Sequence, residues 1–443
     1  MKKKLITSLI YSTFALSSLS HAMTALDDQE LSNIDGQALL SMEYTQGYSA
    51  VDNNGQNIDQ SNVGFYKLGL EAEMELNANI KKLQLGCGGV NNSISSGCDI
   101  DIDHISLSGL PTNSNYTSDD RAATSALLSN PFVELAIKNP KSASTREVMG
   151  FRLSAEKISG LMTLGTSNEV DSNGNGVPNG INSFSGYMKT KTASGTAITA
   201  ERYMTYADTN REIEGEVKGS LLSSSCGGLN ICLDIGYKST DYNLKLESTT
   251  APFTIESTVV SGTRLKDVEL KGYGTVGTLN FSGPLKAKVL NLLNLDKQVT
   301  GNITGLTTDI TVNQNLGLIH ALYLNNPASL SLQAQQILWP GASVAANKGW
   351  WLAMEDEVDL GSLSPTTKVE ITNEVLKQTI DGINKDLTDN PRLCGNLLTG
   401  CIGGSALAVG NIAMTTMLDF PLTNLTLQGQ NFRSNCFGGL KFC

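Results

Sequence analysis

Apolar and polar residues alternate along much of this chain, most clearly in LGLEAEMELNANI at 68–80. The apolar residues at every second position of this run are Leu68, Leu70, Ala72, Met74, Leu76, Ala78 and Ile80. On a helix, at about 100° per residue, these positions would scatter around the whole circumference, whereas on a strand they share one face. The run therefore predicts a long strand with one buried face.

Shorter alternating runs recur to the end of the chain, as in LNICLDI at 229–235 and FPLTNLTLQGQNF at 420–432, with Gly, Asn, Ser and Thr turns between them. The segment ITNEVLKQTIDGINKDL at 371–387 instead has helical spacing, with Thr372 or Asn373 as its cap. The pattern predicts a mainly β protein of long antiparallel twisted sheets in a sandwich or roll. One or two short helices and disulfide-stapled turns complete the expected fold.

The N-terminal 22 residues fit a secretory signal peptide, with lysines at 2–4, an apolar stretch and a cleavage site at Ser20-His21-Ala22. An uncleaved anchor is the other interpretation, but the apolar run is shorter than the ~20 residues that a spanning helix needs. We expect no transmembrane helix in the mature chain. The expected regions are 1–22 (signal peptide), 23–45 (N-terminal cap segment), 46–210 (β-rich with polar loops), 211–335 (β-rich) and 336–443 (helix-containing and β).

The excess of acidic residues excludes some classes of partner for the exported chain. Removing residues 1–22 leaves 29 of the 32 basic residues against 43 acidic ones. Such an acidic surface does not suit nucleic acid or anionic lipid. We therefore do not expect nucleic acid as a partner.

The eight cysteines fall into four close pairs, Cys87/Cys98, Cys226/Cys232, Cys394/Cys401 and Cys436/Cys443. An even count in an exported chain predicts disulfides, and proximity favours the local pairing among 105 possible connectivities. The related phrases CGGLNIC at 226–232 and CFGGLKFC at 436–443 indicate duplicated stapled turns. Zinc is the other interpretation, but no C-x-x-C spacing occurs.

Two stretches could bind a cation. In DSNGNGVPNGIN at 171–182, Asp171, Asn173, Asn175 and Asn179 take positions 1, 3, 5 and 9 of a calcium loop, but position 12 is Asn182 rather than Glu. This predicts an ordinary turn, with weakly bound calcium as the alternative, and we expect no other cofactor. Asp99, Asp101 and Asp103 lie on one face of a predicted strand, and the apolar opposite face favours a solvated acidic face over a metal site.

Signals for catalysis are weak. The chain has no G-x-S-x-G and no phosphate loop after a strand, and His104 and His320 both lie in strand-like context, where a lone histidine is usually structural. Trp339, Trp350 and Trp351 could stack on sugars or form part of a core or interface. We therefore expect a protein that is not an enzyme.

The stretch LDDQELSNIDGQALL begins at Leu26, just after the expected cleavage site. Its L-x-D-x-x-L-S-x-I-x-G-Q pattern is formed by Leu26, Asp28, Leu31, Ser32, Ile34, Gly36 and Gln37. Together with CDIDIDHISLSG at 98–109, this pattern resembles exported gammaproteobacterial pilus-system proteins of the FilA-like group. The resemblance implies a secreted or surface protein associated with fimbria-like structures, and it carries no catalytic residues. The expected partners are accordingly other proteins of a pilus system or a surface assembly. As a short helix, the stretch could cap an open sheet end or dock a partner.

The expected function is a non-enzymatic, exported, structural or adhesive component of a pilus or cell-surface system. It would act at the cell surface, outside the cell or in the outer membrane, with the periplasm as the alternative. Subunits could join by strand addition at exposed edge strands. An outer-membrane β-barrel and a carbohydrate-binding or carbohydrate-active surface protein are the other function classes that the sequence leaves open.

Overall fold

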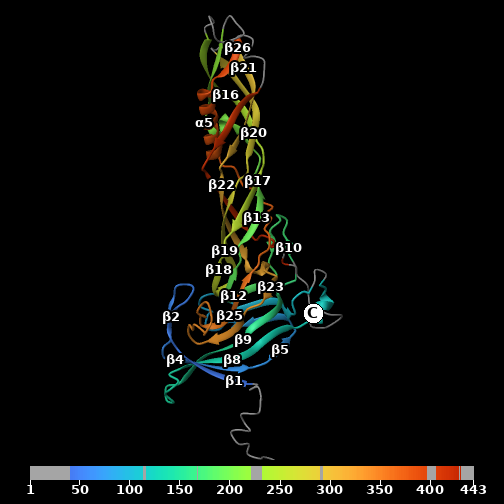
Figure 1. Ribbon diagram of the computed structural model, residues 1–443, viewed down its shortest axis with the longest axis vertical. Coiled ribbons are helices and arrows are strands. Elements are labelled where there is room, and N and C mark those ends of the chain that lie inside the picture. Colours follow the sequence, from blue (N-terminus) through green and yellow to red (C-terminus); the bar gives the residue numbers. More distant parts are fainter. Residues whose placement is uncertain are drawn as a thin grey trace, which may run out of the picture.

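The computed structural model of this chain is an elongated rod built mainly from β-strands (Figure 1). It describes residues 40–112, 116–166, 168–220, 232–289, 293–396, 406–428 and 430. The predicted signal peptide and residues 23–39 of the predicted cap segment lie outside these ranges. Three large sheets follow one another along the long axis, and we call them the base, the waist and the tip.

The base is a 12-stranded sheet whose main path runs β1-β4-β8-β9-β24-β25-β12-β7-β6. Its strands are β1 (Leu40–Gln46), β4 (Val63–Leu70), β5 (Glu73–Leu76), β6 (Ala78–Leu85), β7 (Ile100–Ser108), β8 (Ala126–Lys138), β9 (Glu147–Thr163), β12 (Ile181–Thr190), β18 (Val259–Leu265), β23 (Ala321–Leu324), β24 (Ala328–Gln333) and β25 (Gly349–Val358). The last residues of β9 also pair with β7, so part of the sheet closes on itself. The hairpins β2 (Ser49–Val51) with β3 (Asn57–Asp59) and β10 (Glu169–Val170) with β11 (Gly176–Val177), and the one-turn helix α3 (Ser118–Ala122), lie outside this sheet.

The waist is a five-stranded sheet in the order β13-β17-β19-β22-β28. Its strands are β13 (Ala193–Ile198), β17 (Thr250–Ile255), β19 (Asp267–Thr275), β22 (Thr307–Asn315) and β28 (Met417–Thr423). A 3-10 turn, η1 (Leu316–Leu318), follows β22. Segment 359–371 runs beside the outer edge of β13, with isolated bridges to Gly195 in this strand and to Thr199 just after it.

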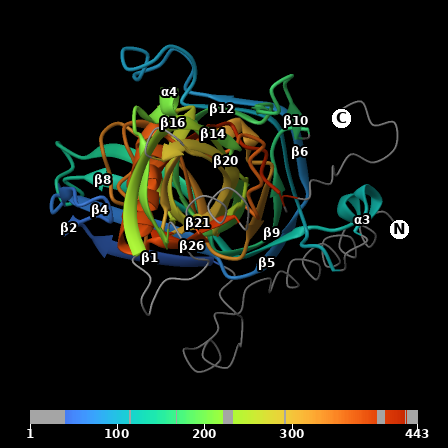
Figure 2. The same ribbon diagram turned by 90° about the horizontal axis from the view of Figure 1, so that it is seen from above.

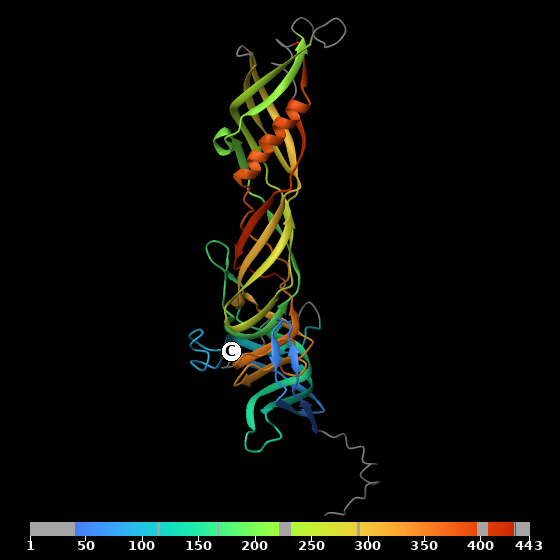
Figure 3. The same ribbon diagram turned by 90° about the vertical axis from the view of Figure 1, so that its left-hand side faces the viewer.

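The tip is a seven-stranded sheet that wraps a helix (Figure 3). Its elements are β14 (Arg202–Thr205), α4 (Tyr206–Thr209), β15 (Ile213–Ser220), β16 (Cys232–Leu246), β20 (Leu279–Val289), β21 (Leu293–Thr304), α5 (Asn373–Asp389), β26 (Arg392–Asn396) and β27 (Leu407–Ala413). The helix predicted at 371–387 is confirmed as α5, and Thr372 is its N-cap. Its buried side chains are Val375, Leu376, Thr379, Ile380, Ile383 and Leu387.

The chain runs back and forth along the rod, so the sheets are not consecutive stretches of sequence. It crosses the waist in all five strands and again in segment 359–371. Viewed along the long axis, the strands of the tip surround that axis (Figure 2). The three sheets therefore cut across the ranges expected for separate regions. The boundary expected between the regions 211–335 and 336–443 falls between β24 and β25, which are paired neighbours in the base sheet.

Most strand pairs are antiparallel, as predicted, but four are parallel: β12–β25, β15–β26, β21–β27 and β22–β28. Each of these pairs contains one of the last four strands. The parallel pairs form because the final part of the chain returns along paths already taken by earlier strands. One hydrophobic core joins all three sheets, with Ile102 in the base, Phe253 in the waist and Leu244 in the tip.

Candidate functional site

The base sheet carries two straight rows of apolar side chains across six strands. The first row joins Met42, Leu68, Val133, Leu153, Leu330 and Leu352, and the second joins Tyr44, Tyr66, Leu135, Phe151, Leu332 and Trp350. Directly opposed residues on neighbouring strands lie on the same face of a sheet. We call the face that these two rows form the apolar base face.

This apolar face is largely open to solvent at the β1 side. Met42 is 82% exposed, Leu68 47% and Leu153 44%. Towards β24 and β25 the rows become half-buried, because Leu330 and Leu352 pack against the main core. Two edge-to-face or tilted ring pairs lie within the second row, Tyr44–Tyr66 with centroids 4.9 Å apart and Phe151–Trp350 at 5.9 Å.

The prediction of one long strand at 68–80 with a buried face was therefore right that the run forms β-strand, but wrong about its continuity and its burial. The run is divided among β4, β5 and β6, and its apolar side chains at Leu68, Met74 and Ile80 are each more than one-third exposed. Alternation identifies which residues share a face, but it does not say whether anything in the same chain covers that face.

The opposite face of the same strands carries charges. Glu43, Lys67, Glu134 and Arg152 are directly opposed across β1, β4, β8 and β9, so their signs alternate. The inner pair is covered by segment 336–346, where Trp339 is 2% exposed. The same face also carries buried apolar residues, among them Phe65, Ala136 and Trp351, which pack against this segment. Both faces of these strands are therefore partly apolar, but segment 336–346 covers only the face with the charges.

Glu134 and Arg152 form the buried end of this ladder. The Arg152 Nε atom donates to a Glu134 carboxylate oxygen over 2.9 Å, and an Arg152 terminal nitrogen donates to the Pro340 carbonyl over 2.9 Å. Burial raises the pKa of the Glu134 carboxyl, and the Arg152 guanidinium partly offsets this rise. Lys67 continues the ladder, with its Nζ atom 3.6 Å from Glu43 and 3.0 Å from Glu156.

A sequence signal for this face exists but was missed. Each of the four charged residues stands between two apolar ones, in MEY at 42–44, YKL at 66–68, VEL at 133–135 and FRL at 151–153. A single charge of alternating sign inside an apolar triplet, repeated in four strands, predicts neighbouring strands with one charged and one apolar face. The resemblance and the alternation alone did not single out these residues.

The other predicted sites have structural surroundings. The predicted disulfide between Cys87 and Cys98 is present. Cys232 is also disulfide-bonded. The side chain of Cys394, and all of Cys226, Cys401, Cys436 and Cys443, lie outside the described residues.

The three aspartates of the 98–109 phrase do not form one solvated face, contrary to expectation. Asp99 is 1% exposed, and its carboxylate accepts from Arg264 Nε over 2.9 Å, from Asn91 over 3.0 Å and from the Trp350 amide over 3.1 Å. Asp101 and Asp103 lie 2.5 and 2.9 Å from Lys82 Nζ. Asp99 is buried because it pairs with the buried Arg264. The local sequence pattern could not predict this partner, which lies 165 positions away.

The stretch proposed as a calcium loop forms a tight turn between β10 and β11. One carboxylate oxygen of Asp171 accepts from the amides of Asn173 (2.8 Å) and Asn175 (2.9 Å), and these bonds lower its pKa. The side-chain oxygen of Asn179 accepts from the Thr166 amide over 3.1 Å. Calcium at this turn stays a prediction. In the part of the chain that the structure describes, no group of three or more His, Cys, Asp or Glu residues could hold a metal ion.

The tryptophans and one histidine belong to cores. Trp339 and Trp351 are each 2% exposed, and Trp350 is half-buried. His320 is fully buried, with Nδ1 2.8 Å from the Leu164 carbonyl. Burial lowers the pKa of His320 below its ordinary value. A structural role for His320 therefore fits its surroundings.

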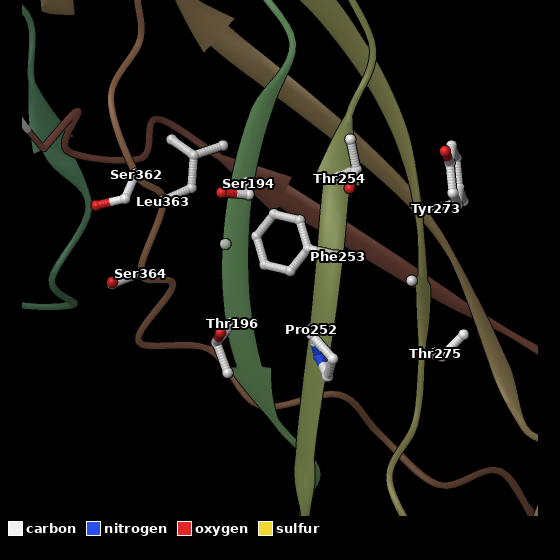
Figure 4. Close-up of a pocket in the computed structure, with 12 residues that line it drawn as sticks. Ser194, Thr196, Pro252, Phe253, Thr254, Tyr273, Thr275, Ser362, Leu363 and Ser364 are labelled. Atoms are coloured by element: carbon white, nitrogen blue, oxygen red, sulfur yellow. The ribbon is translucent and has the colours of Figure 1, made fainter.

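A second surface feature is an open groove of about 550 Å³ across the outside of the waist (Figure 4). One wall is the row Ser362, Ser194, Thr254 and Tyr273, the other is Ser364, Thr196, Pro252 and Thr275, and the floor is Leu363, Gly195, Phe253 and Gly274. The lining contains no charged side chain. Tyr273 is 61% exposed at one end of the groove, opposite Ser362 and Ser364 in Figure 4.

Comparisons with protein families, with curated proteins and with solved structures found no match for this chain. Within the described ranges, no helix combines the length and apolarity needed to cross a membrane.

Proposed function

We propose that this chain is a non-enzymatic, exported structural or adhesive component of a pilus or cell-surface assembly. It acts as a stiff spacer and attaches through its base. The observation that carries this proposal is the apolar base face, because a monomeric soluble protein does not usually leave two adjoining apolar rows uncovered. The rod shape supports a spacing role, and the resemblance of the sequence to FilA-like pilus-system proteins agrees with it.

Covering this face would contribute favourable free energy to docking. Full burial of one large apolar side chain contributes about 1.5–3 kcal/mol, so covering a half-exposed one contributes about 1 kcal/mol. The exposed members of the two rows are Met42, Tyr44, Leu68, Val133, Leu135 and Leu153. Together they supply about 6 kcal/mol towards the cost of association, and main-chain hydrogen bonds at the edge of β1 would add to this.

The test is a matched pair of substitutions in cells that make the native assembly. Met42→Lys places a charge on the apolar base face, and Met417→Lys places the same charge on the waist, where Met417 is 62% exposed. Both variants should fold, because both side chains are in solvent. We expect only Met42→Lys to disappear from the sheared surface fraction, measured by immunoblot against the periplasmic fraction.

Two results would count against the proposal. Native protein that is found only after the outer membrane is broken would point to a periplasmic role. Equal surface amounts for the Met42→Lys and Met417→Lys variants would show that the apolar base face is not the attachment site.

The waist groove favours one second function, the binding of an uncharged sugar. Hydroxyl groups can both donate and accept, and an exposed tyrosine ring offers a flat apolar surface with a polar tip. Binding of the mature chain to a panel of uncharged oligosaccharides, and its loss in Tyr273→Ala but not in Tyr203→Ala, would support this role. Tyr203 is the control because it is 54% exposed on β14, outside the groove.

A further inference from the structure

Strand β1 forms an open edge of the base sheet. Its seven residues pair with β4 in one unbroken register from Leu40–Leu70 to Gln46–Gly64, and no strand within the described ranges pairs with its other side. Natural sheets usually protect such an edge with charged side chains, above all lysine, with proline, with a bulge or with a very short strand. Of these devices the sequence of β1, LSMEYTQ, contains one, the single charge of Glu43.

The charge ladder ends at this same edge with an incompletely neutralised acid. Glu43 has a side chain that is 64% exposed, and its partner Lys67 lies closer to Glu156 (3.0 Å) than to Glu43 (3.6 Å). Across the sheet the signs run negative, positive, negative and positive from β1 to β9. One more strand beside β1 would therefore continue the alternation if it placed a basic residue opposite Glu43.

We infer that the free edge of β1 accepts an extended strand from another protein of the assembly, and that this strand has an apolar–basic–apolar pattern. Its basic residue would lie opposite Glu43, and its apolar residues would lie opposite Met42 and Tyr44 and extend the apolar base face. This inference rests on the proposed function, and it adds the chemistry and the binding mode of the partner.

A second copy of β1 does not fit this pattern. The strand LSMEYTQ carries no basic residue. Two such strands paired antiparallel and centred on Glu43 would place two carboxylates opposite each other, which is destabilising. The occupant is therefore a different strand.

The first test uses a purified mature chain and a synthetic peptide in which apolar and polar residues alternate around a central lysine. Binding is followed by fluorescence anisotropy, with a central-glutamate peptide as the comparison. We expect the lysine peptide to bind about fivefold more tightly than the glutamate peptide. Glu43→Lys should reverse this preference. Glu269→Lys, which changes an exposed glutamate on the waist, should leave the preference unchanged.

A second pair of peptides tests the binding mode. An added strand pairs through alternate residues only, because its other amides point away from β1. N-methylation at one set of alternate residues should reduce affinity at least tenfold, while methylation at the other set should leave it unchanged. These outcomes do not depend on where the protein resides in the cell, so they are separate from the surface-fraction test.

Three results would overturn the inference. The first is equal binding of both methylated peptides, or no binding of the lysine peptide. The second is a charge preference that Glu43→Lys does not reverse. The third is binding that appears only after residues 23–39 are removed, which would identify that segment of the same chain as the occupant.

Discussion

Removing the Arg264 side chain should destabilise the base strongly. Arg264 and Asp99 are almost fully enclosed, with side chains 1% and 2% exposed, and the Arg264 Nε atom lies 2.9 Å from the Asp99 carboxylate. The guanidinium also donates to the Gly86 carbonyl over 3.0 Å and to the Ser95 carbonyl. It therefore holds both ends of the loop that the Cys87–Cys98 disulfide closes.

The magnitude follows from what Arg264→Met leaves behind. The variant keeps an apolar stem but leaves a buried carboxylate and two carbonyls without their cation, and breaking a buried ion pair in this way costs about 3–5 kcal/mol. Replacing both partners, as in Asp99→Leu with Arg264→Met, should cost less than the sum of the two single changes. The charged group left unpaired in each single variant is absent from the double variant.

The assay is urea unfolding followed by tryptophan fluorescence, because the Trp350 amide donates to Asp99 and its ring lies in the same region. With an m value of about 3 kcal/mol/M, the Arg264→Met midpoint should fall by about 1–1.7 M. The matched control is Arg211→Met, which breaks an exposed pair with Asp381 at 3.2 Å and should cost under about 1 kcal/mol. Equal shifts for the two arginine variants, or additive single changes, would refute the reasoning.

Three further changes test other parts of the fold. Burial lowers the folded-state pKa of His320, so the unfolded chain binds protons first as pH falls below about 6.5, and stability declines there. His320→Asn should flatten the profile of unfolding midpoint against pH below about 6.5. Replacing Cys87 and Cys98 by serine should lower the free energy of unfolding by about 3 kcal/mol in urea titrations. Gly382→Ala should destabilise α5 in thermal melts despite the better helix propensity of alanine, because the new Cβ would lie 2.6 Å from a methyl group of Ile412.

The local elements of the fold could be predicted from the sequence because their signals are local. Alternation identified strands, and the 3.6-residue spacing with a Thr372 cap identified α5. The stacking of three sheets could not be predicted, because it depends on contacts between distant segments, such as the parallel bridge between Gly195 and Leu363. No short window of sequence contains both members of such a pair.

Only part of the candidate site could be predicted from the sequence, for a related reason. Periodicity placed Leu68 with its apolar neighbours on one face, and this was correct. Whether that face is covered depends on the route of segment 336–346, which lies over the charged face instead. The charges could have shown only that these strands are neighbours, because Glu43 and Arg152 stand at equivalent places in different strands.

The path of the chain bears on how the proposed spacer would carry load. In the waist and the tip the strands run along the long axis of the rod (Figures 1 and 3). Hydrogen bonds between antiparallel strands are perpendicular to the strands, so a pull along the axis loads many of them together in shear. Because the chain crosses the waist in five strands and in segment 359–371, load passing from base to tip is shared among several covalent segments. A rod built in this way would resist extension, which suits a component that links two parts of a surface assembly.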